Sequence, residues 1–498
     1  MPEPLASSNE QTQLTQPEAD TARMSSALGA VGRHRGAILA VILVSYFMIV
    51  LDNSIVFTGL TSIREELGFT TAGLSWVQNA YALVFGGLLL LGARAGDVLG
   101  RRRVFVVGLV IFSLASLAIG LSPNAGWMIA ARAVQGIGSA ILAPTSLALL
   151  AATFPEGPER TRAVAGYGSV AGLGASFGLV LGGVLADLLT WRVGFLINVP
   201  IGIVLLIAAL RFIPAGTRST GRFDIGGAIT STIGMTLVVY AITRTAESGW
   251  TDPLTLSLLG GGLLVVALFV VIEMRAPQPI LPLRVFANRV RTGAFLARLL
   301  FAGAMFGYFF FISQYMQGAL RFTPLQAGLG FLPMSVVQFA VALNVSRLTR
   351  RFGNTALLTV GLVITTVGML WLSRADPDSS YIVAVALPMI LLGLGQGLGF
   401  APLTAAGITA IQPRDAGAAS GLVNVAHQLG GALGVSIMVA VAAFGDTSTT
   451  PAGIAAQTTD GITTGAVLLM LAIVAALTLI VPGTRALNRS RNLSNSSI

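Results

Sequence analysis

The sequence predicts an all-α polytopic membrane protein. Of its 498 residues, 54% are hydrophobic and only 10% are charged, whereas soluble chains carry about 25% charged residues. Apolar runs of roughly 20 residues, each long enough to cross a bilayer core, recur along the whole chain. We count fourteen such spans, which begin near residues 37, 71, 102, 127, 160, 193, 224, 254, 291, 325, 355, 381, 415 and 463.

The distribution of charge orients these spans. With the N-terminus inside, the inner segments hold 23 arginines and 10 acidic residues, and the outer segments hold 5 and 9. Positive charge collects on the cytoplasmic side of membrane proteins, so we expect both termini in the cytoplasm and a bacterial plasma-membrane location. The formal charge of +10 then reflects topology and contact with lipid head groups, and no nucleic-acid partner is expected.

The two halves of the chain are similar in sequence. Residues 94–111 align with residues 347–364, since both segments end in Val-Gly-Leu-Val-Ile, and QGIG at 135–138 corresponds to QGLG at 396–399. Parallel repeats of this kind indicate two six-span halves, which leave two spans over. The expected divisions are a disordered cytoplasmic N-terminus at 1–35, a six-helix bundle at 36–213, two extra spans with linkers at 214–290, a second six-helix bundle at 291–484 and a cytoplasmic tail at 485–498. We also expect the outer segment 445–460 to be a mobile loop.

Asp52 is the only acidic residue that we place inside a span. At 1.5 Å per residue it lies about 24 Å along the first helix, towards the outer half. An ionisable residue in hydrocarbon is costly and indicates function. A carboxylate placed between an apolar core and a guanidinium can bind and release a proton as a cavity opens to either side. The alternative is an acid at the interface, wetted by outer water.

Arg132 lies in the middle of the fourth span. Gln135 and Gly136 follow it by three and four residues and therefore share its helix face. An arginine at this depth must face a cavity or a partner. Arg132 could tune the affinity of Asp52 for protons, or it could be structural, with its guanidinium satisfied by carbonyl groups alone.

Four segments resemble the major facilitator superfamily and, within it, the fourteen-span drug:proton antiporter branch. GARAGDVLGRRR at 92–103 resembles the signature loop between spans 2 and 3. LDNSIV at 51–56 resembles the element that closes the first span, and ARAVQGIGSA at 131–140 resembles the fourth-span motif whose arginine takes part in proton coupling. WRVGFLINVPIG at 191–202 is similar to the start of the sixth span in that branch.

Glycines recur every four residues in the fifth span. They leave one helix face without side chains and permit close approach of another helix. The segment resembles the antiporter motif of the superfamily, although Leu179 stands where a proline is usual. Simple helix packing would produce the same pattern. The residues concerned are Gly174, Gly178, Gly182 and Gly183.

The resemblance implies a monomeric, non-enzymatic transporter with two six-helix bundles around a central cavity. It implies export of lipophilic drugs or antibiotics, driven by a proton gradient and without a cofactor, with Asp52 and Arg132 in proton coupling. An endogenous metabolite or lipid precursor is the alternative substrate. An intramembrane enzyme or sensor is a further class, but the sequence offers no nucleophile–base or metal constellation for it. A latch between the halves at the cytoplasmic face is expected from Asp97, Gly100, Arg101, Arg102 and Arg103.

Aromatic and amide side chains of the later spans are candidates for lining a cavity for flat apolar substrates. For about half of the aromatic residues, packing against lipid is an equal alternative. His427 could modify coupling near neutral pH or could be a packing residue. A single acid in the spans favours neutral or monovalent substrates over dications. The candidate cavity residues are Gln135, Phe306, Phe309, Gln314, Tyr315, Gln396, Asn424 and His427.

Overall fold

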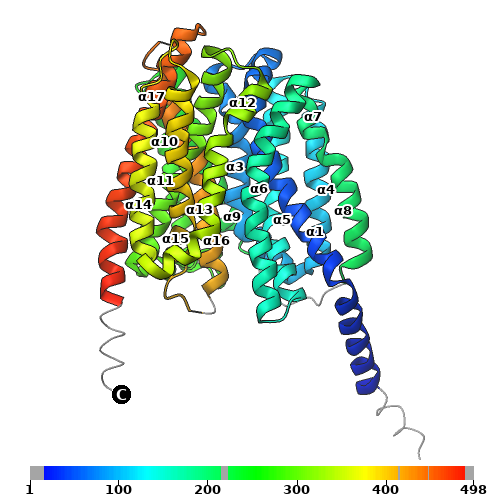
Figure 1. Ribbon diagram of the computed structural model, residues 1–498. Helices are drawn as coiled ribbons and strands as arrows, with labels where there is room; N and C mark the ends of the chain where they lie inside the picture. Colours follow the sequence, from blue (N-terminus) through cyan, green and yellow to red (C-terminus); the bar gives the residue numbers. More distant parts are fainter. Residues whose placement is uncertain (1–15, 215–222, 413–414, 447, 488–498) are drawn as a thin grey trace, which may run out of the picture.

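The computed structural model describes residues 16–214, 223–412, 415–446 and 448–487. These ranges contain fourteen helical segments that are long and apolar enough to cross a membrane, which confirms the predicted fold class. Both ends of the described chain lie at the same end of the bundle, which we call the terminal face (Figure 1). The opposite end is the far face.

The first six spans form the N-terminal half. They consist of α1 (Gln16–Leu67), α2 (Thr71–Leu74) with α3 (Trp76–Leu99), α4 (Arg101–Gly120), α5 (Ala125–Thr153), α6 (Pro158–Leu188), and α7 (Trp191–Leu196) with α8 (Asn198–Phe212). Residues 16–35, for which we expected disorder, belong to α1. The remainder of that predicted segment, residues 1–15, lies outside the described residues.

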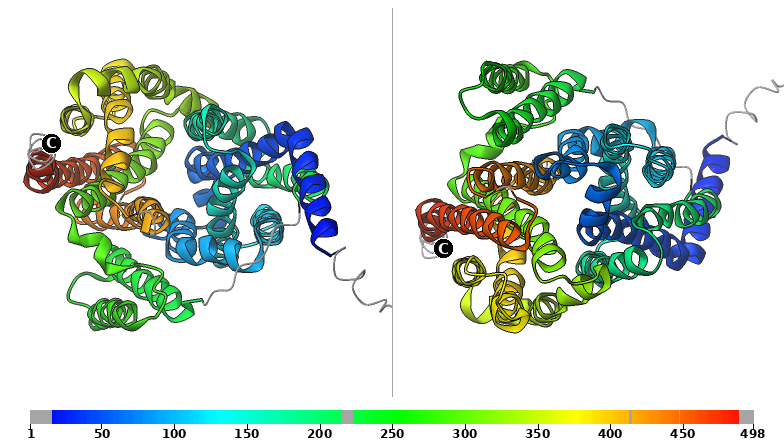
Figure 2. Two further views of the ribbon diagram at one scale, coloured as in Figure 1. Left: turned by 90° about the horizontal axis from the view of Figure 1, so that it is seen from below. Right: turned by 90° about the horizontal axis from the view of Figure 1, so that it is seen from above.

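Two extra spans and the C-terminal half follow. The extra hairpin of α9 (Ile225–Ser248) and α10 (Pro253–Arg275) lies at the periphery, where α9 contacts α3 and α16, one helix from each half (Figure 2). This is the predicted arrangement of six plus two plus six spans. After the short helix η1 (Leu283–Ala287), the C-terminal half consists of α11 (Arg289–Gln314) with η2 (Tyr315–Ala319), α12 (Pro324–Gly330) with α13 (Leu332–Phe352), α14 (Asn354–Leu372), η3 (Ile382–Ala386) with α15 (Leu387–Gly407), α16 (Ala416–Ala442), and α17 (Pro451–Ala475) with η5 (Ala476–Ile480).

The last span begins twelve residues earlier than predicted, at Pro451 instead of 463. The expectation of a mobile loop over 445–460 is therefore wrong for its second half. The Thr450 side chain caps the helix by accepting a hydrogen bond of 3.2 Å from the backbone N–H of Gly453, and Pro451 takes a first-turn position that suits its fixed φ. Threonine and glutamine in the first turns hide this helix from a reading of hydropathy.

The sequence repeat corresponds to a shared corner in the two halves. Gly100 joins α3 to α4 with φ +98°, and Gly353 joins α13 to α14 with φ +83°. Glycine adopts this left-handed region without the steric cost that a Cβ brings. The aligned glycines therefore make equivalent turns at the terminal face.

The two halves contact each other along α3 and α16, where Gly421 faces Leu90 on the side of the terminal face, and they also meet at the far face. There α6 contacts α12, and α1 contacts α11. Nearer the terminal face the same helix α6 is open, since a Cβ added at Gly168 or Gly172 would meet no heavy atom within 4 Å. Three side chains of the C-terminal half donate hydrogen bonds across the closed end: Ser313 to the carbonyl of Phe57 (2.5 Å), Gln317 to the carbonyl of Thr58 (3.2 Å), and Thr323 to the carboxylate of Asp187 (3.1 Å).

Asp252 should make the start of α10 sensitive to acid. A hydrogen bond from the backbone N–H of Thr255 lowers the pKa of Asp252 below its ordinary value of 3.8, and the Thr255 hydroxyl and Arg244 contribute further. A carboxyl with a lowered pKa stabilises the fold above its ordinary value, and this contribution is lost as the pH falls through the lowered one. Hydrogen exchange at residues 254–257, expressed relative to the unfolded chain at the same pH, should accelerate in that acidic range. Asp252→Asn, which cannot titrate, should show no such acceleration; equal acceleration in both proteins would contradict the assignment.

Candidate functional site

Asp52 and Arg132 form an ion pair that is fully buried in the N-terminal half. Asp52 comes from α1 and Arg132 from α5, and both side chains are 0% exposed, with Nη1 of Arg132 2.8 Å from Oδ2 of Asp52. Asp52 lies near the middle of the span His34–Leu67. The alternative of an interfacial acid in contact with outer water is therefore wrong, because α1 extends well beyond Asp52 on both sides.

Amide side chains complete the contacts of the carboxylate. Oδ1 of Asp52 accepts hydrogen bonds from Nε2 of Gln135 (2.8 Å) and Nδ2 of Asn198 (2.7 Å). Both amides also donate to the Ser116 hydroxyl, at 2.8 and 3.4 Å. We call Asp52, Ser116, Arg132, Gln135 and Asn198 the Asp52 cluster. It joins α1, α4, α5 and α8.

Arg132 is held by both charged and neutral partners. Its Nη1 donates to Asp52 and, at 2.6 Å, to Oε1 of Gln135, while its Nε donates to the carbonyl of Val77 at 2.8 Å. The guanidinium carbon lies 4.3 Å from the centre of the Tyr81 ring, a distance at which a cation is attracted to an aromatic face. The alternative of an arginine satisfied by carbonyls alone is therefore wrong.

Protonation of Asp52 would change the contacts within the Asp52 cluster. As a carboxylate, Asp52 accepts from donors on α5 and α8, and protonation would remove the charge that holds the Arg132 guanidinium. Buried charge pairs are strongly coupled, because removing one member leaves the other uncompensated in an apolar region. Binding or loss of one proton can therefore change how α1 contacts α5 and α8.

Two members of the cluster were missed by sequence reasoning. We took residues 191–202 as a mark of family, although Asn198 is the only amide in an otherwise apolar stretch at the start of the sixth span. That isolated amide could have identified Asn198 as a candidate site residue. Ser116 gave none, since serines are common in membrane helices, where their hydroxyls bond to the preceding turn, as Ser116 does to the carbonyl of Phe112.

The glycines of α6 press this helix onto the part of α1 that carries Asp52. A Cβ at Gly178 would lie 2.7 Å from Cβ of Ser54, and one at Gly182 would lie 2.9 Å from Cα of Ile55. Gly174 faces Val50 in the same way. Gly183, on another side of the helix, packs against α12 of the C-terminal half, and α6 runs through Leu179 without interruption. The glycines thus serve close packing beside Asp52 and between the halves.

Gly178→Ala should impair the protein more than the same change at Gly172. The added methyl group at Gly178 overlaps backbone and side chain of α1, whereas Gly172 has open space beside it. Overpacking of this kind costs about 1–3 kcal/mol. We expect a lower thermal midpoint and slower transport for Gly178→Ala, with Gly172→Ala close to the unsubstituted protein. Equal effects of the two changes would contradict the packing role.

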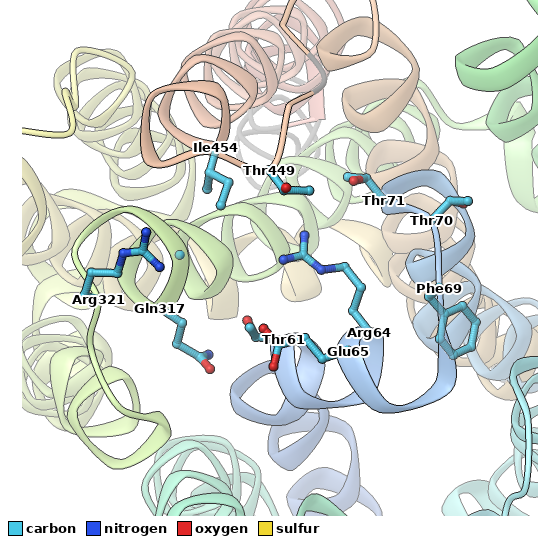
Figure 3. A pocket seen from close by; sticks show the side chains of 11 residues that line it. Thr61, Arg64, Glu65, Phe69, Thr70, Thr71, Gln317, Arg321, Thr449 and Ile454 are labelled. Atoms are coloured by element: carbon cyan, nitrogen blue, oxygen red, sulfur yellow. The ribbon is translucent and has the colours of Figure 1, made fainter.

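A cavity of about 490 Å³ opens at the far face between the two halves. Figure 3 shows Arg64 and Glu65 of α1 on one side of it and Gln317 and Arg321 of the C-terminal half on the other. Thr61, which also lines the cavity, is nine residues beyond Asp52 on α1, or about 14 Å along the helix. The cavity is therefore separate from the Asp52 cluster and lies on its far side.

The Major Facilitator Superfamily model matches residues 42–435. The chain belongs to the major facilitator superfamily. It is 40% identical over 468 residues to a cephamycin export protein of Amycolatopsis lactamdurans, an alignment that covers 92% of this chain and 96% of that protein. It is 39% identical over 437 residues to a puromycin resistance protein of Streptomyces alboniger, with 85% and 86% covered. The relatives and the fourteen spans place this transporter among the drug exporters of the superfamily, so it is a multi-pass bacterial membrane protein and not an enzyme.

Solved structures show the same fold at low sequence identity. A peptide transporter in complex with sulfate superposes with a TM-score of 0.67 at 14% identity, over 90% of this chain and 94% of that chain. A bacterial homologue of the human lysosomal transporter Spinster gives 0.65 at 13% identity, over 91% and 97%.

The predicted latch residues lie at the terminal face of the transporter. Arg101 forms an ion pair of 3.4 Å with Asp97 one turn before it, and Arg102 donates to the carbonyl of Leu210 at 2.6 Å. Gly100 is buried at the corner and Arg103 is exposed. Both of these contacts lie within the N-terminal half, and a latch between the halves stays a prediction.

The predicted cavity residues fall into separate places. Gln135 belongs to the Asp52 cluster, and Phe306 lies edge-on to His427 with ring centres 5.3 Å apart. The others have individual contacts: Phe309 stacks on Phe57, Gln314 donates to the carbonyl of Phe310, Tyr315 donates to the carbonyl of Asp376, Gln396 lies 3.6 Å from the sulfur of Met334, and Asn424 donates to the carbonyl of Ser420. Their assignment to one substrate cavity stays a prediction.

Asp52 is not the only acid inside a span. Glu273 lies two residues before the end of α10 and is only 3% exposed, with Oε2 accepting a 2.9 Å hydrogen bond from the backbone N–H of Leu281. The prediction that Asp52 is the one acid inside a span is therefore wrong, because the helix continues past Glu273 to Arg275.

Proposed function

We propose that this transporter is a proton-coupled antiporter that exports lipophilic antibiotics across the cytoplasmic membrane. It acts as a monomer, without a cofactor, and the proton gradient drives it. The observation that carries the proposal is the Asp52 cluster, in which one carboxylate, fully buried at mid-span, forms an ion pair with a single arginine. The names of the cephamycin and puromycin relatives support antibiotics as the substrate class.

The terminal face is the cytoplasmic one in this proposal. The segments at that face carry most of the arginines of the chain, as the positive-inside rule requires. Side-chain hydrogen bonds join the halves at the far face, and substrate would enter from the cytoplasmic side. Protons would reach Asp52 from the far-face cavity once that end opens.

Coupling follows because a proton competes with the Arg132, Gln135 and Asn198 side chains for the Asp52 carboxylate. When Asp52 is charged, it holds α5 and α8 against α1 through Arg132, Gln135 and Asn198. When Asp52 takes up a proton from outside, these contacts weaken and the halves are free to return to the state open to the cytoplasm. Loss of the proton to the cytoplasm completes the cycle, with one direction of substrate movement tied to the opposite direction of the proton.

Efflux measurements in cells test the proposal. The transporter is produced in a bacterial host that lacks its main exporters, and accumulation of ethidium, puromycin and a cephamycin is followed with and without a protonophore. We expect lower accumulation of at least one compound than in vector controls, and the protonophore should remove the difference. Efflux that persists after the gradient collapses would contradict proton coupling. Absence of efflux for every compound would contradict broad drug export and favour a narrow endogenous substrate.

A further inference from the structure

A second arginine is buried in the C-terminal half, apart from the Asp52 cluster. Arg298 of α11 is 3% exposed, and its Nε and Nη1 are buried without a hydrogen-bond partner among the described residues. None of the ion pairs in the described ranges involves it. By contrast Arg291, buried two turns earlier on the same helix, donates to the carbonyls of Val285 and Ala410 at 2.8 Å each. An unsatisfied buried guanidinium is costly and requires an explanation.

Aromatic rings surround Arg298. Its guanidinium carbon lies 3.8 Å from the centre of the Phe400 ring on α15, and the His427 ring on α16 lies 6.0 Å from that of Phe400. Phe306, two turns further along α11, contacts His427 edge-on. Tyr46 of α1 is close enough to interact electrostatically with Arg298, so the N-terminal half also contributes to the surroundings. Nδ1 of His427 is a second buried polar atom without a partner.

The surroundings of Arg298 are only partly covered. Phe400 is 39% exposed although it covers a buried guanidinium, and Tyr46 and His427 are only half-buried. Tyr46 stacks on Tyr167 of α6 at 3.9 Å, next to the part of α6 that is open near Gly168. Arg298 lies nine residues from the start of α11, about 14 Å from the terminal face. A molecule that reaches this place would contact the exposed Phe400 ring before the buried guanidinium.

We propose that Arg298 binds the carboxylate of an exported organic anion. The guanidinium supplies unpaired donors that match a carboxylate, and Phe400, Phe306 and Tyr46 supply apolar surface for an aromatic or aliphatic body. A neutral substrate would leave the charge uncompensated, and a cationic one would be repelled by it. The inference rests on the proposed export function and narrows its substrate class to lipophilic monoanions.

Equilibrium binding tests this assignment without a proton gradient. The full chain is placed in phosphatidylcholine nanodiscs and titrated with dansyl-phenylalanine, a lipophilic aromatic carboxylate, and with its neutral amide, with empty nanodiscs as background. We expect the acid to bind at least tenfold more tightly than the amide. Arg298→Gln should remove that difference by weakening the acid alone, and Arg298→Lys should retain part of it. Unchanged amide binding shows that the variant is folded.

The matched control is Arg289→Gln, which removes the same charge from the exposed first residue of the same helix. It should bind acid and amide as the unsubstituted protein does. Equal affinity for acid and amide in the unsubstituted protein, or full acid affinity in Arg298→Gln, would overturn the proposal. Competition by added phosphatidylglycerol that disappears in Arg298→Gln would assign the site to a lipid phosphate instead.

The outcome is independent of the test of proton coupling. If acid binding depends on Arg298 and the unsubstituted protein exports the cephamycin in a protonophore-sensitive way, both proposals stand. If the acid assignment fails while such efflux persists, only the anion site is wrong. If acid binding depends on Arg298 but efflux does not respond to the gradient, the proposed coupling is wrong.

Discussion

Asp52→Asn should reduce gradient-driven efflux at least tenfold while the protein still inserts and folds. Asparagine has the size of aspartate and keeps an oxygen that can accept from Nη1 of Arg132, but it cannot take up and release a proton. Efflux is measured after an imposed pH gradient in proteoliposomes. Exchange of labelled substrate without a gradient should continue, because that process needs no net proton movement.

The matched control is Asp378→Asn, an acid-to-amide change at an exposed residue of the far face. It should leave both gradient-driven efflux and exchange unchanged. Gradient-driven efflux that survives in Asp52→Asn would exclude Asp52 as the proton site. Loss of both efflux and exchange in Asp52→Asn, with normal insertion, would assign Asp52 to substrate binding.

Arg132→Met should destabilise the transporter by about 3–5 kcal/mol. Methionine has a similar length, but it leaves the Asp52 carboxylate buried without a cation, and such an uncompensated charge is more costly than the loss of the pair itself. Unfolding in denaturing detergent or by heat would measure the change. Transport should fall to background, since the cluster no longer separates two protonation states.

The double variant Asp52→Asn with Arg132→Met separates charge balance from packing. Replacing both members of a buried pair by neutral groups is often nearly neutral for stability, so most of the lost stability should return, although transport should not. If the double variant is as unstable as Arg132→Met alone, the instability arises from lost packing against Tyr81 and the Val77 carbonyl and not from the unpaired carboxylate.

The membrane spans were predictable because the hydropathy of a segment follows directly from the amino acids that it contains. The second and third spans begin at 71 and 101 in the structure, against predicted starts of 71 and 102. The exception is α17, whose threonine-rich first turns resemble a loop. Asp52 and Arg132 were also predictable, since a charge within an apolar run is conspicuous in any sequence.

The rest of the site depends on which helix faces meet. Asn198 and Ser116 carry no charge, and their importance follows from α8 and α4 bringing them to the same carboxylate. Arg298 stands in an apolar stretch of the sequence, between Ala297 and Leu299, but the sequence cannot show whether such a residue has a partner. Its isolation is a property of the folded chain, because it requires that no acceptor of the described residues lies within hydrogen-bond distance of Nε and Nη1.

The side-chain hydrogen bonds that join the halves near the far face set an energy scale for the transport cycle; besides those of Ser313, Gln317 and Thr323, they include one of 2.8 Å from Nδ2 of Asn79 to the Ser436 hydroxyl. Side-chain hydrogen bonds between membrane helices average about 0.6 kcal/mol, so breaking these four costs about 2 kcal/mol. One elementary charge that crosses a membrane potential of 100 mV releases about 2.3 kcal/mol. The free energy of a single proton per cycle is therefore similar to that of the polar contacts at the closed end. Variants that add or remove one of these hydrogen bonds should shift the membrane potential at which the exporter works.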